Sequence, residues 1–213
     1  FETLDDMIRQ AMLPANMVLN VFSLRGGVGT TTIAVNLALA LKLAGREVCL
    51  VDLCQNSGHV STLLRLPAKV TWVEAAGQIN TLSLEALDTL LLKHDSGLYV
   101  LPAPFMPVVR APAADGVGQL MSLIKSKFGS MIVDLGALDE VGRAALAASH
   151  GTLVVLAPEV ASLQTTVATL RVLKAMGLPD EKILLTLNQV APRAGLTLAA
   201  IEKALGRSLI IAL

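Results

Sequence analysis

The sequence predicts an α/β fold, in which a doubly wound, mostly parallel sheet carries helices on both faces. Three observations lead to this prediction. Short apolar runs alternate with longer amphipathic segments along almost the whole chain, which is the pattern of repeated βαβ units. Apolar residues make up 54% of the 213 residues and charged residues only 16%, as expected for a sheet that is buried on both faces. A glycine-rich segment also separates the first predicted strand from the first long predicted helix.

The predicted strands and helices follow one another in order. Each strand is a short, mainly apolar run that ends at a turn residue or a polar segment, and the expected strands are 18–24, 48–53, 98–101, 131–133, 153–157, 183–187 and a short last one at 209–211. The helices are recognised by the helical spacing of apolar residues and by terminal glycines, and they are expected at 30–44, 84–92, 118–128, 141–149, 161–176 and 198–205. In the helix 161–176, the predicted apolar stripe consists of Leu163, Val167, Leu170 and Leu173.

The domain organisation predicted from the sequence is simple. Residues 17–213 are expected to form one domain, and residues 1–16 a lead-in or linker from a missing upstream domain, since the chain begins with Phe1 rather than Met. No apolar run reaches the roughly 18 uncharged residues of a membrane span, and no signal peptide opens the chain. These observations predict a cytoplasmic protein. Lys plus Arg balance Asp plus Glu at 17 each. Because this neutral balance gives no general attraction to nucleic acid, nucleic-acid binding is not expected.

The two cysteines, Cys49 and Cys54, lie five positions apart in or just after one predicted strand. Side chains alternate along a strand, so an odd separation places them on opposite faces and they are not expected to form a disulfide. Without a cluster of histidines nearby, they are not expected to form a zinc site either.

A predicted phosphate-binding loop joins the first strand to the first long helix. Its residues are Arg25, Gly26, Gly27, Val28, Gly29, Thr30, Thr31 and Thr32. Glycines let backbone N–H groups turn toward a phosphate, and the start of the helix adds free N–H groups and a partial positive charge. The strict pattern Gly-x-x-x-x-Gly-Lys-Ser/Thr fails twice, because Leu24 replaces its first Gly and Thr30 replaces its Lys. Loss of that lysine removes a contact of about 1.5–3 kcal/mol, which weakens binding by about one or two powers of ten.

Several polar segments follow other predicted strands. In a doubly wound sheet, ligands bind outside the carboxyl ends of the strands. We therefore expect the phosphate loop to meet the segments 52–58, 134–136, 158–159 and 188–189 at one edge of the sheet.

The loop 25–32 resembles the deviant Walker A motif of the ParA/MinD family, Lys-Gly-Gly-x-Gly-Lys-Thr-Thr. Three more stretches resemble further motifs of that family: 51–55, 131–134 and 187–190. Within the family, the chain looks most like the TadZ/CpaE group of pilus-assembly localisation factors, on the residues 57–64, 97–104, 157–159, 162–163 and 201–207. The resemblance implies a MinD-like P-loop NTPase fold over residues 17–213 and a receiver-like domain upstream.

The resemblance also implies a ligand set. ATP or ADP with Mg²⁺ is expected, bound weakly or at a vestigial site. Thr31, Asp52 and Asp134 match the family's positions around Mg²⁺, and Asn188, with Pro158, matches the side that holds adenine. A face-to-face homodimer is the expected assembly, with pilus or secretion assembly proteins as partners and with placement at a cell pole or on the inner face of the membrane through them.

Three positions depart from the family pattern. Arg25 replaces the signature Lys that reaches the partner's nucleotide, and it keeps the positive charge. Thr30 replaces the P-loop Lys. Cys54 replaces the catalytic Asp, and a thiol is a weak hydrogen-bond acceptor that orders an attacking water poorly. Asp139 and Glu140 are expected to cap the following helix rather than to replace that Asp.

Three functions are compatible with these residues. The first is an ATP-binding localisation module with weak or absent hydrolysis. The second is a working ATPase switch of the ParA/MinD type, in which Arg25 supplies the missing charge. The third is a DNA-segregation factor, against which the zero net charge speaks.

Overall fold

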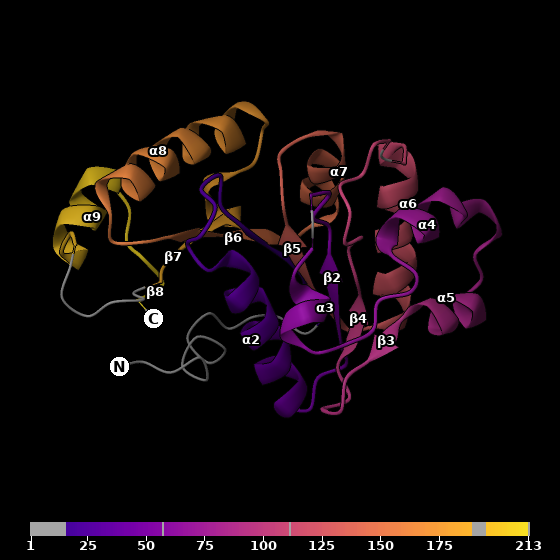
Figure 1. Cartoon of the computed structure of the whole chain (residues 1–213). Coiled ribbons are helices and arrows are strands. Elements are labelled where there is room, and N and C mark those ends of the chain that lie inside the picture. The colour runs from indigo at the N-terminus through magenta and orange to yellow at the C-terminus, as the bar shows by residue number, and fades with distance from the viewer. Residues whose placement is uncertain (1–15, 57, 111, 189–194, 213) are drawn as a thin grey trace.

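A computed structural model of the chain describes residues 16–56, 58–110, 112–188 and 195–212 (Figure 1). The predicted lead-in 1–16 lies outside this part except for its last residue, and so do Gln189 and Val190. Strands and helices alternate as predicted, except over residues 53–98, where three helices and a short strand follow one another. The strands are β1 (Val18–Phe22), β2 (Val48–Asp52), β3 (Leu92–Lys93), β4 (Tyr99–Leu101), β5 (Ser130–Leu135), β6 (Gly151–Leu156), β7 (Ile183–Leu187) and β8 (Ile211–Ala212). The helices are α2 (Thr30–Leu43), α3 (Val60–Leu63), α4 (Trp72–Gly77), α5 (Leu84–Leu90), α6 (Ala114–Lys127), α7 (Glu140–Ala148), α8 (Val160–Ala175) and α9 (Leu198–Leu205), with short 3₁₀ turns at Ile79–Thr81 and Asp180–Lys182.

Within the described residues the strands form one sheet in the order β3-β4-β2-β5-β1-β6-β7-β8. Every neighbouring pair is parallel except β3 and β4. The chain starts near the middle of the sheet and winds outward in both directions, which confirms the predicted doubly wound α/β architecture. In Figure 1, α8 and α9 lie at the β7 end of the sheet and α4, α5 and α6 at the β4 end.

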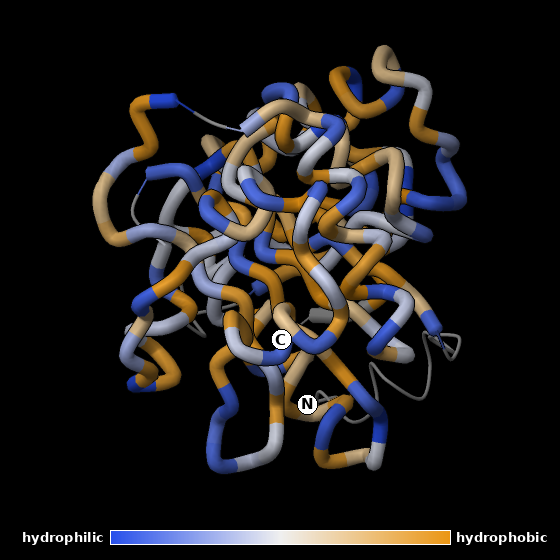
Figure 2. Tube along the Cα trace, turned by 90° about the vertical axis from the view of Figure 1, so that its right-hand side faces the viewer, coloured by the Kyte–Doolittle hydropathy of each residue, from blue (hydrophilic) through white to orange (hydrophobic). Residues whose placement is uncertain are grey.

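Two hydrophobic layers cover the two faces of the sheet. On one face, α2 packs its buried Ile33, Leu37 and Leu41 against residues such as Leu19 and Ile132. On the other face, α4, α5, α6 and α7 pack around a second cluster that contains Trp72, Leu120 and Phe22. Because both faces are covered, the strands read as almost continuous apolar runs, and hydrophobic segments run through the middle of the molecule in Figure 2.

The most buried side of the helix α8 differs from the side that the sequence predicts. Its buried residues are Ser162, Thr166, Thr169 and Leu173, whereas Leu163, Val167 and Leu170 are half-buried. The buried hydroxyls are satisfied locally: Thr166 Oγ1 donates to the Ser162 carbonyl at 2.8 Å, and Ser162 Oγ accepts from the Ala157 N–H at 2.9 Å. A hydroxyl that is already hydrogen-bonded to its own helix is cheap to bury. The predicted apolar stripe is confirmed in part: Leu173 is fully buried, and Leu163 and Leu170 are half-buried against the hydrophobic clusters, but Ser162, Thr166 and Thr169 take the most buried positions.

Several local predictions are confirmed. The helix α2 ends just before Gly45, whose φ is +81°, and α7 begins with Asp139, whose carboxylate accepts from the Gly142 N–H at 3.0 Å. Cys49 and Cys54 are both free thiols. No helix in the described part of the chain has the length and hydropathy needed to cross a bilayer.

Candidate functional site

Three neighbouring strands, β2, β5 and β1, place the predicted site at the carboxyl edge of the sheet. Asp52 and Asp134 are register partners at the ends of β2 and β5, and Asp134 is also the register partner of Val21 in β1. The loop from Ser23 to Gly29 leaves β1 beside them. The parallel register therefore brings together the phosphate loop and two aspartates that lie far apart in the sequence.

The phosphate loop ends at the N-terminus of α2, which is open to an anion. Gly29 is the N-cap residue, no side chain caps the helix, and its first turn contains no acidic residue. The first N–H groups of a helix have no partner within the helix. These groups, together with the partial positive charge of the helix end, are the features by which a phosphate is bound.

Gly29 allows a close contact between the loop and the end of β7. Asn188, which follows β7, donates its side-chain N–H to the Val28 carbonyl at 2.8 Å. A Cβ atom on Gly29 would lie 2.2 Å from Asn188 Nδ2, and the φ of Gly29 is +89°. Only glycine fits this position, both for its backbone conformation and for the space available.

A cavity of about 500 Å³ lies over the loop and the two strand ends. It is lined by Ser23, Arg25, Gly26, Gly27, Gly29, Thr30, Thr31, Thr32, Cys54, His59, Leu63, Asp134, Leu135 and Gly136. Most of the predicted nucleotide-binding residues are therefore in one place. Sequence reasoning did not single out His59 or Leu63 as lining residues. They lie in the segment that follows β2, so the rule about carboxyl ends of strands applies to them as well.

Four predicted site residues lie beside the cavity rather than on its wall. Val28 is buried in the hydrophobic cluster that contains the α2 residues, and Asp52 is fully buried beside Cys54 and Asp134. Asn188 contacts the loop through the Val28 carbonyl. Pro158 is buried, and its carbonyl accepts from the Leu196 N–H at 2.8 Å.

The two aspartates are unusually placed for charged groups. Asp134 is 1% exposed, and its buried Oδ2 has no hydrogen-bond partner among the residues that the structure describes. Burial and the nearby charge of Asp52 raise the pKa of Asp134 from 3.8 to about 7, although a hydrogen bond with the Thr31 side chain opposes the shift. Burial also raises the pKa of Asp52, against the effect of N–H groups from Cys54 and Val60. An ion that supplies positive charge here would relieve both groups.

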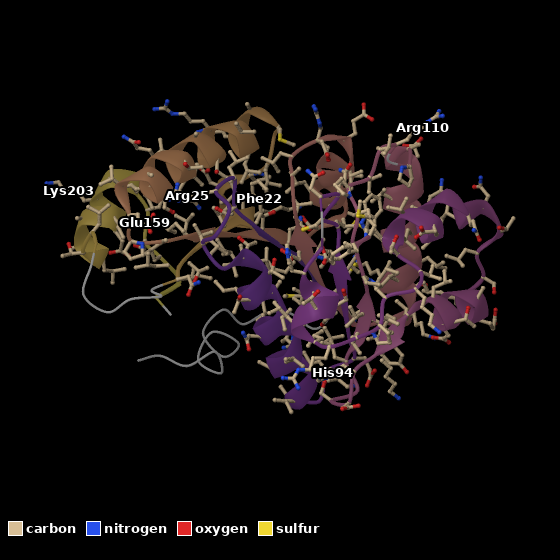
Figure 3. All side chains as sticks on the ribbon, in the orientation of Figure 1. Phe22, Arg25, His94, Arg110, Glu159 and Lys203 are labelled. Carbon is tan, nitrogen blue, oxygen red and sulfur yellow. The ribbon has the colours of Figure 1, made fainter. Side chains whose placement is uncertain are left out.

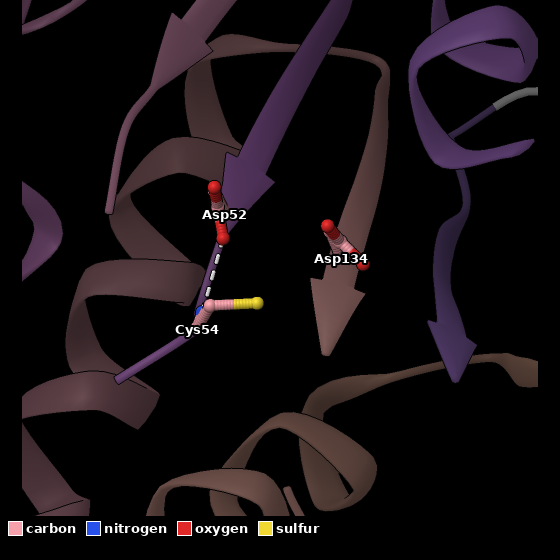
Figure 4. A group of neighbouring side chains, drawn as sticks. All are labelled: Asp52, Cys54 and Asp134. Atoms are coloured by element: carbon pink, nitrogen blue, oxygen red, sulfur yellow. Dashed lines mark hydrogen bonds between the residues drawn. The ribbon is translucent and has the colours of Figure 1, made fainter. Parts of the chain in front are cut away.

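Cys54 completes this group of side chains. One ligand atom from each of Asp52, Cys54 and Asp134 lies within 4.8 Å of the other two (Figure 4). The Cys54 backbone is held on both sides: its N–H donates to Asp52 Oδ1 at 3.1 Å, and its carbonyl accepts from Trp72 Nε1 at 3.3 Å. Burial raises the pKa of the Cys54 thiol, and the charges of Asp52 and Asp134 raise it further. Without a metal, Cys54 is therefore a neutral thiol.

Arg25 has a partner within its own chain. Its Nη2 lies 2.9 Å from Glu159 Oε2, and the two side chains are partly exposed (Figure 3). Glu159 comes directly before α8, so this pair joins the phosphate loop to the end of β6. Sequence reasoning placed both residues at the same edge of the sheet but did not pair them.

Comparison with known proteins identifies the family of this chain. The family model described as cellulose biosynthesis protein BcsQ matches residues 17–198, which includes the loop and the three strand ends. The chain belongs to the BcsQ family of ParA/MinD-type P-loop proteins. The septum site-determining protein MinD of Thermotoga maritima is 29% identical to this BcsQ-family chain over 178 residues, which are 82% of the chain and 65% of that protein. The chain thus spans slightly less than two thirds of the length of this relative.

Solved structures give the same fold. A ParA family ATPase from Chlorobium tepidum superposes with a TM-score of 0.85 at 24% identity, over 93% of this BcsQ-family chain and 85% of that one. The septum site-determining protein MinD from Pyrococcus horikoshii, solved with Mg-ADP, gives a TM-score of 0.76 at 24% identity, over 92% and 80% of the two chains. At this identity, the likeness establishes the P-loop α/β fold alone.

Proposed function

We propose that this chain is a localisation domain that binds ATP or ADP with Mg²⁺ and hydrolyses ATP slowly or not at all. One observation carries the proposal. The open helix end and its loop face a cavity, while a thiol and a threonine, Cys54 and Thr30, stand at the positions where the resemblance places a carboxylate and a lysine. Such a site keeps the elements that bind a phosphate and loses two that speed its transfer.

Nucleotide binding is supported by the loop, the free N–H groups of α2 and the neighbouring aspartates. Oxygen ligands are those that Mg²⁺ prefers, and the residues that would hold it are Thr31, Asp134 and Asp52. The partnerless Oδ2 of Asp134 fits this role. Bound Mg²⁺ would offset the negative charge of both the carboxylates and the phosphates. Because Thr30 brings no charge, we expect ATP binding to depend on Mg²⁺ more strongly than in a site with a P-loop lysine.

Slow hydrolysis is supported by the properties of Cys54. Phosphoryl transfer depends on a positioned nucleophile and on stabilised charge. The Cys54 thiol is neutral and a weak acceptor, so it positions water poorly. Asp139 is already occupied, since it caps α7 and its Oδ2 accepts from the Gln55 side chain in a short contact.

The test is to measure ATP affinity by calorimetry and turnover by phosphate release on the purified protein. We expect detectable Mg-ATP binding, a much weaker signal without Mg²⁺, and turnover close to background. Replacing Cys54→Asp should raise turnover, and Cys54→Ser is the matched control that should not. Absence of binding would refute the nucleotide site, and rapid turnover by the unaltered chain would refute the slow-hydrolysis claim.

A working ATPase switch is the second candidate function. Arg25 favours it, because a guanidinium beside the loop can stabilise charge on a transferring phosphoryl group. Under this alternative, Arg25→Ala abolishes hydrolysis. If the unaltered chain turns over ATP and Arg25→Ala leaves that rate unchanged, Arg25 does not stabilise charge during hydrolysis.

The cellular role that we propose is positioning of an envelope machine by a nucleotide-dependent homodimer. The TadZ/CpaE-like stretches favour a pilus or related secretion machine, and the match to the BcsQ family favours one that takes part in cellulose biosynthesis. Imaging the tagged, full-length protein in cells that lack either machine distinguishes the two. A polar focus that persists without both machines would refute the proposed role. Retardation of DNA in a low-salt gel shift would instead support DNA segregation.

A further inference from the structure

We propose that Asp52, Cys54 and Asp134 form a site for a thiophilic divalent cation such as Zn²⁺ or Co²⁺, which binds in the absence of nucleotide. The proposal goes beyond nucleotide binding and rests on the geometry of these three side chains. Their ligand atoms lie within 4.8 Å of one another, which is close enough for one ion to contact all three after small side-chain movements. Figure 4 shows the Cys54 side chain pointing from the end of β2 toward the Asp134 side of the site.

The backbone fixes the positions of these ligands. Asp52 and Asp134 are register partners in adjacent strands, and the Leu53 N–H donates to the Asp134 carbonyl at 2.9 Å. Cys54 is held through its N–H and its carbonyl, and its sulfur packs against Gly136, where a Cβ atom would lie 3.1 Å from Sγ. A site on strand ends held in this way needs little reorganisation to bind an ion.

Within the described part of the chain, little positive charge lies beside the two carboxylates, although His59 lines the same cavity and favours the charged form of Asp52. Two carboxylates, 0% and 1% exposed, lie side by side, and one of the Asp134 oxygens has no hydrogen-bond partner in the described ranges of the chain. The guanidinium of Arg25, which lines the same cavity, is paired with Glu159, and the position of the P-loop lysine holds Thr30. A buried carboxylate oxygen without a partner is costly, and a cation is the group that satisfies it.

The sulfur decides which cation is favoured. Carboxylates alone suit Mg²⁺, whereas a thiolate selects softer ions such as Zn²⁺. On binding, the S–H bond of Cys54 breaks, its proton passes to the solvent, and a sulfur–metal bond forms with no change of oxidation state. One sulfur and two carboxylates leave a fourth position open in a tetrahedral site, as in zinc sites that also hold water.

The experiment is a titration of the nucleotide-free protein with Co²⁺, followed by the thiolate-to-cobalt charge-transfer absorbance. We expect one Co²⁺ per chain with this band, displacement by Zn²⁺, and resistance to a large excess of Mg²⁺. In Cys54→Ser we expect the band to vanish and the affinity to fall about tenfold or more. The matched control is Cys49→Ser, which removes the fully buried thiol at the other end of β2 and should keep the band.

Circular dichroism shows whether each variant is folded. If Cys54→Ser does not fold, Cys54→Ala is the second variant to test. No band in the unaltered protein would overturn the proposal. A band that survives in a folded Cys54 variant, or displacement of Co²⁺ by Mg²⁺ at similar concentrations, would overturn it as well. Because no nucleotide is present, these outcomes are independent of whether the protein binds ATP.

Discussion

Asp134 shows how a single residue sets the pH dependence of this fold. The unfolded chain releases the proton of Asp134 near its ordinary pKa of 3.8, whereas the folded state keeps it up to a pKa of about 7. The folded state therefore binds more protons between these values, and the free energy of unfolding falls as the pH rises through them. The raised pKa of Asp52 acts in the same direction.

We predict that Asp134→Asn stabilises the metal-free protein at pH 8 and changes it little at pH 4. The gain at pH 8 should be on the order of 2–4 kcal/mol, because the neutral amide removes the buried charge. Thermal unfolding at both pH values measures it. The control is Asp88→Asn, which removes an ion pair with Lys127. We expect its effect on the free energy of unfolding to be similar at pH 8 and pH 4. A loss of stability at pH 8 in Asp134→Asn would contradict the prediction.

Thr30 offers a second prediction for one residue. Thr30→Lys restores the ammonium group that normally reaches the phosphates, so the affinity for Mg-ATP should rise by about one to two powers of ten. Thr30→Met, which adds similar length without charge, is the control and should leave the affinity near that of the unaltered chain. Calorimetry measures all three proteins. Equal gains for Lys and Met would show that charge is not the cause.

The phosphate loop is the element on which local geometry acts most strongly. Gly27 and Gly29 both have φ above +80°, but a Cβ atom would meet nothing within 4 Å at Gly27 and would meet Asn188 at Gly29. We predict that Gly27→Ala destabilises by about 1–2 kcal/mol from backbone strain alone and that Gly29→Ala destabilises by more. Urea unfolding measures both. In a Gly29→Ala background, Asn188→Ala should recover part of the loss, and no recovery would mean that the clash is not the reason.

At the level of elements, the sequence predicts the helices and strands that have long apolar runs or that end at a glycine. The central strands and the long helices follow from such runs, and α2 was predicted to within one residue. The helix α3 has only four residues and β3 only two, which is too short for any periodicity. The helix α4, which was not predicted, has a local sequence signal in the capping box formed by Thr71 and Glu74. The predicted helix 118–128 begins four residues after the observed start of α6 at Ala114.

The sequence predicts which residues form the candidate site, but it does not predict which side chains contact one another there. The order of strand ends along the chain indicates that the loop, Cys54 and Asp134 share one edge. The contact of Arg25 with Glu159 joins residues 134 positions apart, and no pattern in the sequence selects one acidic partner among several. The burial of Asp52 and Asp134 likewise depends on the register of β2 and β5, which only the folded sheet defines.

For the whole molecule, the pair of Arg25 and Glu159 bears on assembly. If Arg25 reaches a partner's nucleotide in a dimer, it must first leave Glu159. We predict that Glu159→Gln tightens the Mg-ATP-dependent dimer by up to about fivefold, since an exposed ion pair is worth about 0–1 kcal/mol. Sedimentation velocity over a concentration series measures the dissociation constant. A weaker dimer in this variant would count against the prediction.

The control for this experiment is Glu47→Gln. It breaks the pair with Lys42, which has the same length of 2.9 Å and lies away from the cavity. We expect this variant to dimerise like the unaltered chain. Equal effects of the two variants would mean that the dimer responds to net charge and not to the release of Arg25.

The hydrogen bond from Asn188 to the loop also fixes how its amide is oriented. Only the NH₂ group of the amide can donate to the Val28 carbonyl, so the side chain cannot flip without losing that bond. The relative positions of the remaining N–H donor and of the oxygen acceptor of this amide are then fixed. A purine edge with the complementary order finds two partners there, and one with the reverse order finds two mismatches. If the proposed nucleotide binds, the identity of its base would in this way be read by an amide that the phosphate loop itself holds in place.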